Sequence, residues 1–174
     1  MSLNQEDYRA QERTFDLITQ VCGRSGRGRY PGKAVIQTYS PDDETLLLSS
    51  RHDYKSFYNN EIEFRSMLGY PPFCEFININ FSDGDFNKVK NTAQEFYDSL
   101  CQAVKEKGLD EYMTMFPPAQ AVIGRINDKY RYRILAKSRY NKALYDTIGS
   151  VYEKYSKSAK YANIIIDVNP QNMY

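Results

Sequence analysis

The sequence has little of several residue types, and each shortage excludes a class of protein. Tryptophan is absent, His52 is the single histidine, and the three cysteines form no C-x-x-C pair. A zinc site within this chain is therefore not expected, and reduced thiols in a cytosolic protein are the simplest interpretation. There is no signal peptide and no apolar run of membrane-spanning length, so we expect a cytoplasmic protein without a membrane partner.

The sequence also has no excess of charge of either sign. It carries 23 Lys and Arg residues against 22 Asp and Glu residues in 174, a net charge of +1. Overall charge therefore does not indicate nucleic-acid binding, and only local clusters of basic residues could indicate it. The phosphate-binding pattern G-x-x-x-x-G-K-[ST] is missing, so we expect no ATPase activity from this chain alone.

A basic, glycine-rich stretch runs from Gln20 to Arg29. Arg24 and Arg27 lie three residues apart there, and their planar guanidinium groups suit phosphate oxygens. Neighbouring glycines let the backbone approach a ligand closely. The stretch predicts either a phosphate-facing arginine pair or a flexible basic loop, and the spacing alone favours neither.

The pattern Gln20-x-x-Gly23-Arg24-x-x-Arg27 resembles motif VI of superfamily 2 helicases. The chain after this motif resembles the C-terminal end of the PriA family of primosomal replication-restart helicases. The matching residues are Lys33 to Tyr39, Pro41, His52-Asp53-Tyr54, Phe57-Tyr58, Glu61, Phe64-Arg65, Leu68-Gly69-Tyr70-Pro71-Pro72-Phe73 and Tyr130-Arg131-Tyr132-Arg133. The resemblance extends from about Tyr8 to Pro170.

The resemblance implies roles for the motif VI residues in an intact helicase. Arg27 would be the arginine finger at the γ-phosphate of ATP, Arg24 a neighbouring phosphate or interlobe contact, and Gln20 an assisting residue. ATP and Mg²⁺ would be the cofactors of the intact enzyme, an ATP-dependent 3′ to 5′ DNA helicase, and none is expected for this chain. The zinc of the family belongs to an upstream cysteine-rich module, and Met1-Ser2-Leu3 is typical of an added leader.

Three parts are expected along the chain. Residues 1–40 would be the C-terminal remnant of the second RecA-like lobe, with a helix over 5–21 stopped by Gly23 and a strand over 34–39. Residues 41–72 would form a helical connector, and residues 73–174 an accessory domain. In the connector we expect a short helix through Ser49 and a longer one that Asp53 caps and Gly69 stops.

The third part predicts an α+β fold in the order strand, helix, strand, strand, helix, strand. Pro117-Pro118 must bend or interrupt the second strand, and Asn127-Asp128-Lys129 forms a hairpin turn. The expected strands cover 76–81, 112–116 with its continuation 121–126 after the prolines, 130–137 and 164–168. The apolar stripes of the two helices are Val89, Ala93, Phe96, Leu100, Val104 and Leu144, Ile148, Val151, Tyr152, Tyr155. Two helices on one face of an antiparallel sheet indicate a ferredoxin-like sandwich, similar to the ribosomal-protein-like domain that ends PriA relatives.

A second basic cluster, interleaved with tyrosines, is the candidate nucleic-acid-binding site. Its members are Arg125, Lys129, Tyr130, Arg131, Tyr132, Arg133 and Lys137. On a strand, Arg131, Arg133 and Lys137 share one face, while Tyr130 and Tyr132 share the other. Such a strand can hold a phosphate backbone and stack unpaired bases, or it can be a solvated sheet face balanced by acids.

Partners are also implied by the resemblance. Forked and single-stranded DNA, primosome proteins and the acidic C-terminal tail of single-stranded DNA-binding protein are expected, the tail at Arg139 before the second helix. Self-association through residues 1–40 is a further expectation, because an apolar helix there lacks its lobe. A stand-alone RNA-binding module and an interaction domain for an acidic peptide remain the alternatives.

Two other polar pairs have structural explanations. His52-Asp53 has no nucleophile nearby in the sequence and predicts a helix cap. Glu61 and Arg65, four residues apart, predict a helix-stabilising ion pair.

Overall fold

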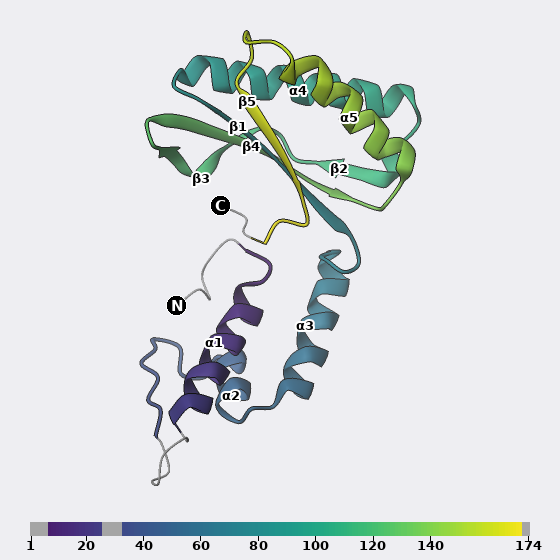
Figure 1. The fold of residues 1–174 in the computed structure, drawn as a ribbon. Coiled ribbons are helices and arrows are strands. Elements are labelled where there is room, and N and C mark those ends of the chain that lie inside the picture. Colours follow the sequence, from purple (N-terminus) through teal and green to yellow (C-terminus); the bar gives the residue numbers. More distant parts are fainter. Residues whose placement is uncertain (1–6, 26–32, 172–174) are drawn as a thin grey trace. The chain divides into compact units, whose positions relative to one another are not determined.

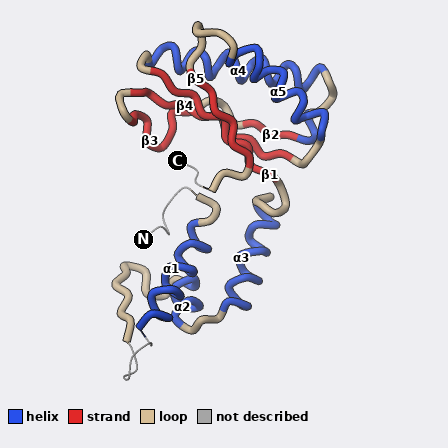
Figure 2. Tube along the Cα trace, viewed as in Figure 1, coloured by secondary structure: helices blue, strands red, loops and turns tan. Residues whose placement is uncertain are grey.

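The computed structural model describes residues 7–25 and 33–171, and it divides the chain into two compact units, Met1–Tyr70 and Pro71–Tyr174. In the first unit the described residues form α1 (Ala10–Ser25), α2 (Glu44–Ser50) and α3 (Tyr54–Leu68). Figures 1 and 2 show these three helices. They are held together by a small apolar core in which the rings of Phe15 and Phe57 stack with centroids 4.3 Å apart.

The caps of α3 form as the sequence predicts. The carboxylate of Asp53 accepts a hydrogen bond from the backbone N–H of Ser56 at 3.1 Å. Hydrogen bonds from the Ser56 hydroxyl and backbone N–H lower the pKa of Asp53. Gly69 ends the helix in the left-handed conformation, with φ of 56°, which glycine adopts without a steric penalty.

Two expectations for residues 1–40 are wrong. Gly23 does not stop α1, which continues to Ser25, whose hydroxyl donates to the carbonyl of Cys22 at 2.7 Å and holds the last turn. Residues 34–39 form no strand, and Val35 is 83% exposed. A strand needs a hydrogen-bonded neighbour, and among the described residues none pairs with this segment.

The second unit is an α+β sandwich, as expected. It contains β1 (Glu75–Asp83), α4 (Phe86–Glu106), the 3₁₀ turn η2 (Asp110–Tyr112), β2 (Met113–Met115), β3 (Ala119–Ile126), β4 (Lys129–Ser138), α5 (Lys142–Ser156) and β5 (Asn163–Val168). The antiparallel sheet has the order β2-β4-β1-β5, and β3 also pairs with β4. Pro117-Pro118 separates β2 from β3, which confirms the expected interruption.

Both helices lie on one side of this sheet, as Figures 1 and 2 show. The stripe of α4 from Val89 to Val104 is buried, and so is that of α5 from Leu144 to Tyr155, except for the half-buried Tyr152. These side chains pack on Ile77, Ile79 and Phe81 of β1. Because side chains alternate along a strand, the residues between them point to the face opposite α4 and α5.

The β3–β4 hairpin closes with a two-residue turn. Asn127 and Asp128 both have positive φ angles, 49° and 59°, which match the twist of the flanking strands. The turn is therefore present at Asn127-Asp128, while Lys129, which was expected in the turn, begins β4; Arg125 then pairs with Tyr130.

Candidate nucleic-acid interface

The alternation of β4 divides the predicted basic cluster. Arg131, Arg133 and Lys137 pair with Ser82, Asn80 and Phe76 of β1, so they lie on the face opposite the helices. We call this surface the helix-free face. Its members are Phe76, Asn78, Asn80 and Ser82 from β1, Arg131, Arg133, Leu135 and Lys137 from β4, and Asn163, Ile165 and Asp167 from β5.

The tyrosines of the cluster lie on the other face of β4. Tyr130 and Tyr132 both contact the edge of Phe86, with ring centroids 5.5 and 5.9 Å away. They are half-buried and pack against the core under the helices. The structure therefore does not bring Tyr130 and Tyr132 to the surface that carries Arg131 and Arg133.

Arg125 and Lys129 lie at the tip of the β3–β4 hairpin. The guanidinium group of Arg125 forms an exposed ion pair with Asp128 at 2.9 Å and lies over the Tyr130 ring, 5.1 Å from its centroid. Lys129 is exposed and begins β4. Arg125 and Lys129 are therefore separate from the row of cations on the helix-free face, and Tyr130 is the tyrosine beside Arg125.

The helix-free face also contains two amide acceptors that have no donor. Asn78 is only 2% exposed, and Asn80 is half-buried two residues along β1. The Oδ1 atoms of both are buried, and neither has a hydrogen-bond partner among the residues that the structure describes. A buried acceptor without a donor costs free energy, about 1–3 kcal/mol each. Alternation along β1 places these asparagines on this face, but nothing in the sequence shows that their acceptors would be unpaired.

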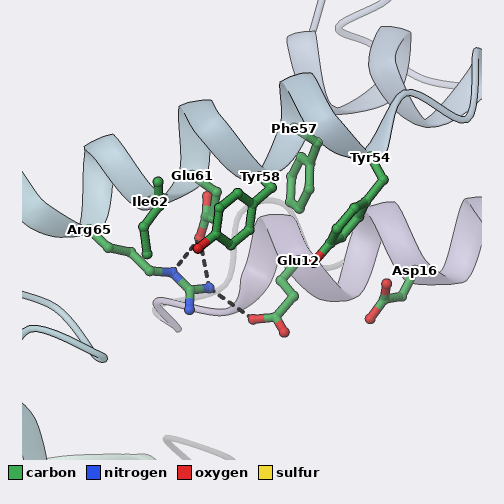
Figure 3. Close-up of a pocket in the computed structure, with 8 residues that line it drawn as sticks. All are labelled: Glu12, Asp16, Tyr54, Phe57, Tyr58, Glu61, Ile62 and Arg65. Atoms are coloured by element: carbon green, nitrogen blue, oxygen red, sulfur yellow. Dashed lines mark hydrogen bonds and ion pairs between the residues drawn. The ribbon is translucent and has the colours of Figure 1, made fainter.

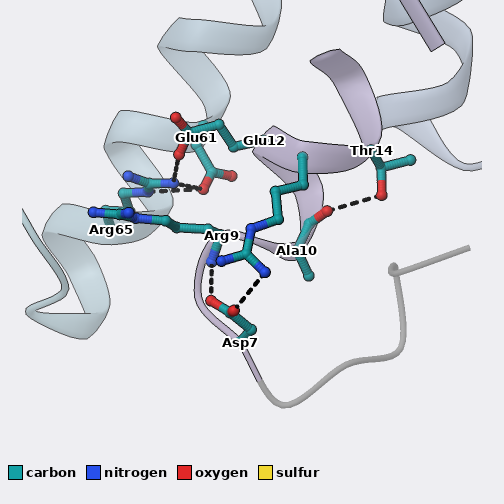
Figure 4. A network of polar contacts seen from close by, with 8 residues as sticks. Asp7, Arg9, Ala10, Glu12, Thr14, Glu61 and Arg65 are labelled. Carbon is teal, nitrogen blue, oxygen red and sulfur yellow. Dashed lines mark hydrogen bonds and ion pairs between the residues drawn. The ribbon is translucent and has the colours of Figure 1, made fainter. Parts of the chain in front are cut away.

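A buried ion-pair network joins α1 to α3 in the first unit. Arg65 donates from Nε to Glu61 Oε1 at 2.8 Å and from Nη2 to Glu12 Oε2 at 2.9 Å (Figures 3 and 4). Burial of its side chain acts to lower the pKa of Arg65, but its hydrogen bonds with Glu12 and Glu61 outweigh burial, and the pKa is raised. The predicted Glu61–Arg65 pair is therefore present, and its extension to Glu12, 53 residues away, was not predicted.

The start of α1 carries a second ion pair. Asp7 accepts a hydrogen bond from the backbone N–H of Arg9 at 2.9 Å (Figure 4). It also lies 3.0 Å from Nη1 of Arg13. Asp7 is 8% exposed, and its ion pair with Arg13 neutralises this buried charge. Both ion pairs fix the helix that carries Gln20 and Arg24.

A cavity of about 280 Å³ lies beside the Arg65 network, and Figure 3 shows its lining. It is lined by Glu12, Asp16, Tyr54, Phe57, Tyr58, Glu61, Ile62 and Arg65. Burial, and then the charge of Glu12, raise the pKa of Asp16.

No group of three or more histidine, cysteine or acidic side chains suited to a metal ion occurs in residues 7–25 and 33–171. No helix in the part of the chain that the structure describes has the length and apolar character needed to cross a membrane.

Comparison with known proteins identifies the family. The family model described as "Primosomal protein N C-terminal domain" (PriA_C) matches residues 66–171. The chain belongs to the PriA_C family. It is 33% identical to the replication restart protein PriA of Bacillus subtilis over 99% of this chain and 21% of the relative. It is 35% identical to PriA of Chlamydia pneumoniae over 97% and 22%, and 37% identical to that of Synechocystis over 78% and 16%.

The chain therefore spans about a fifth of the length of the PriA relatives it matches. A designed protein with a ferredoxin fold, solved by NMR, covers 56% of this chain with a TM-score of 0.31 and 18% identity, while 85% of that protein is covered. We base the fold on the sheet order and the helix layer of the chain itself.

The residues that the family resemblance singles out occupy separate places. Gln20 and Arg24 are exposed on α1, one helical turn apart, and Arg27 lies outside the described residues. Arg139 is exposed between β4 and α5, and its backbone N–H donates to the carbonyl of Tyr112 at 2.9 Å. Next to it, Tyr140 is 75% exposed and its ring lies 5.7 Å from that of Tyr145.

The ring of Tyr145, which lies against Tyr140, has its hydroxyl held by a hydrogen bond. This hydroxyl donates a hydrogen bond to Oε2 of Glu75 at 2.6 Å. Burial, and then this hydrogen bond to a carboxylate, raise the pKa of Tyr145 to about 12. The hydroxyl therefore keeps its proton near neutral pH and can go on donating to Glu75.

We expect Arg65→Ala to destabilise the first unit by about 3 kcal/mol, because it leaves the buried carboxylate of Glu61 without its partner. Glu12→Ala is the matched control, since the Glu12 side chain is 46% exposed against 8% for Glu61. Its loss should cost less than about 1 kcal/mol. Urea unfolding followed by far-ultraviolet circular dichroism measures both, and equal effects of the two variants would contradict a buried network centred on Glu61 and Arg65.

Proposed function

We propose that the second unit of this chain binds DNA through the helix-free face of its sheet, as part of a longer PriA-type protein. The observation that supports the proposal most directly is the register of β4, which aligns Arg131, Arg133 and Lys137 on one face. Among the described residues that the register of β1, β4 and β5 places on this face, these three are cations and one, Asp167, is an acid. A row of cations is what a phosphate backbone requires.

The proposed parent protein is a cytoplasmic ATP-dependent DNA helicase that restarts replication at stalled forks together with primosome proteins. The named PriA relatives are replication restart proteins, which supports this role. The helicase activity, its 3′ to 5′ polarity, and the use of ATP and Mg²⁺ through Arg27, Arg24 and Gln20 rest on the resemblance of the motif. In this proposal the chain itself binds and does not catalyse.

A second partner of the same unit is the acidic C-terminal tail of single-stranded DNA-binding protein. Arg139 is exposed beside the exposed ring of Tyr140, a combination that suits a carboxylate next to an apolar side chain. This position is distinct from the row on β4, because Arg139 follows the last residue of that strand.

Self-association through residues 1–40 stays a prediction, supported by the exposure of Leu17 (52%) and Val21 (54%) on α1.

DNA binding should weaken when the row on β4 loses charge. We expect the double variant Arg131→Ala/Arg133→Ala to lower affinity for forked and single-stranded DNA. The slope of log affinity against log salt should become shallower by roughly 0.7 to 0.9 for each phosphate that the protein no longer neutralises. Fluorescence anisotropy of labelled oligonucleotides over a range of salt concentrations measures both quantities.

The matched control removes the same charge from the helix layer. Lys90→Ala/Lys105→Ala changes two exposed lysines of α4 and should leave the affinity and the slope unchanged. An equal reduction in both double variants, or no binding by the wild type at low salt, would contradict DNA binding by this face.

Acidic-tail binding should depend on Arg139 and not on the sheet. We expect Arg139→Ala to weaken binding of an acidic peptide with a free C-terminal carboxylate by about tenfold, since it removes a hydrogen bond to a charged group. Lys142→Ala, an exposed neighbouring cation at the start of α5, is the control. Isothermal calorimetry that gives wild-type affinity for Arg139→Ala would remove this partner site from the proposal.

A further inference from the structure

The outer strands of the sheet differ in how well they are protected from pairing with another chain. β2 has only three residues and is followed closely by Pro117-Pro118, and the pairing of β3 with β4 shifts register part-way along. Short strands, prolines and bulges are devices by which proteins protect a sheet edge. β5 has none of them: it pairs with β1 in unbroken register over Asn163–Val168, and Asp167 is its one charged residue.

The main-chain groups along the outer side of β5 can be assigned residue by residue. Asn169 donates from its backbone N–H to the carbonyl of Phe76 at 2.7 Å, so these two residues form a hydrogen-bonded pair at the end of the β1–β5 ladder. Because such pairs alternate along antiparallel strands, every second residue of β5 directs its N–H and C=O away from β1. These residues are Ile164, Ile166 and Val168, and no described strand pairs with them on that side.

The sequence of β5 is complementary to itself. When two copies run antiparallel with Ile165 opposite Ile165, Asn163 of each copy lies opposite Asp167 of the other. The asparagine amide can then donate to the carboxylate, and the two isoleucine side chains cover each other. The same register makes Ile164 and Ile166 of the second copy a hydrogen-bonded pair, which satisfies main-chain groups that point outward in both copies.

Other registers fit less well. A shift of one residue sets the outward main-chain groups of one copy against residues whose groups already point to β1, so the ladder hydrogen bonds are lost. With Ile166 opposite itself, Ile165 faces the carboxylate of Asp167, and with Asp167 opposite itself two like charges meet. Pairing about Ile165 is therefore the register that the charges and the main chain both favour.

We propose that two copies of this chain associate through β5 into a two-fold symmetric dimer whose sheet continues from one copy into the other. A two-fold axis places the same surface of both copies against each other, and a self-complementary strand meets that requirement. The pairing covers Ile165, which is 57% exposed, and the edge of the partly buried Ile166. The inference does not depend on DNA binding, and it uses a different surface from Leu17 and Val21 of α1.

Size-exclusion chromatography with light scattering tests the proposal on the full chain. We expect the mass to rise with protein concentration from 20.3 kDa towards twice that value. Concentrations up to about 1 mM are needed, because two edge strands bury a small surface and small interfaces bind weakly. A mass of 20.3 kDa at every concentration would overturn the proposal.

Opposite charges at Ile165 test the register. Ile165→Lys and Ile165→Glu each set like charges against each other at the two-fold axis, so each alone should weaken the dimer by about tenfold. An equimolar mixture of the two variants should regain the dimer, because lysine then lies opposite glutamate. Ile123→Lys is the matched control on β3, since Ile123 is 48% exposed, and it should keep the wild-type dimer.

A disulfide gives a second measurement that does not depend on the charged variants. In a non-hydrogen-bonded pair the Cα atoms lie about 4.5 Å apart, within the range that a disulfide spans. Ile165→Cys should therefore form a covalent dimer on mild oxidation, while Ile123→Cys and the wild type should form much less.

The outcomes separate the possible surfaces. An unchanged dimer in both charged variants, or a mixture that stays monomeric together with no covalent dimer of Ile165→Cys, overturns pairing about Ile165. Loss of the dimer in Leu17→Lys/Val21→Lys but not in Ile165→Lys would assign association to α1 and overturn the proposal. DNA binding by β4 is unaffected by any of these results, because it is measured at concentrations where the chain is monomeric.

Discussion

The two-residue period of β1 is the constraint on which the second unit depends. Ile77, Ile79 and Phe81 have no exposed surface and form the sheet side of the core under α4 and α5. A strand that turns these residues inward must turn Phe76, Asn78, Asn80 and Ser82 to the other side. The positions of the amides, and through the pairing of β4 also those of Arg131 and Arg133, therefore follow from the packing of the core.

The same constraint separates the basic row from the tyrosines. A slip of one residue in the β1–β4 register would place Arg131 and Arg133 under the helices and bury their charge, which is prohibitively costly. The pairing of Ile79 with Ile134 keeps the apolar residues of both strands together. Charge on one face and packing on the other are thus two consequences of one register.

Local signals in the sequence were sufficient for much of the fold. The helix stripes of α4 and α5, the Asp53 and Gly69 caps of α3 and the Asn127-Asp128 turn all depend on residues within a few positions of one another. The α+β class followed because these elements alternate in the order that a ferredoxin-like sheet requires. The faces of Arg131 and Tyr130 were predictable for the same reason, since alternation is a local property of a strand.

The features that the sequence did not predict depend on distant residues. The segment 34–39 has the composition of a strand, but no described neighbour pairs with it. The extension of α1 past Gly23 is the local exception, since it is held by a hydrogen bond between Ser25 and Cys22. The link from Arg65 to Glu12 and the missing donors of Asn78 and Asn80 result from the assembly of helices and strands that are far apart in the chain.

The central claim is that the helix-free face is where DNA binds. Nuclear magnetic resonance of the ¹⁵N-labelled full chain, titrated with an unlabelled single strand, tests it most directly. We expect shift changes in β1, β4 and β5, including the side-chain NH₂ signals of Asn78 and Asn80, while the signals of α4 and α5 stay in place. Shift changes confined to α4, α5 or the first unit would contradict the account.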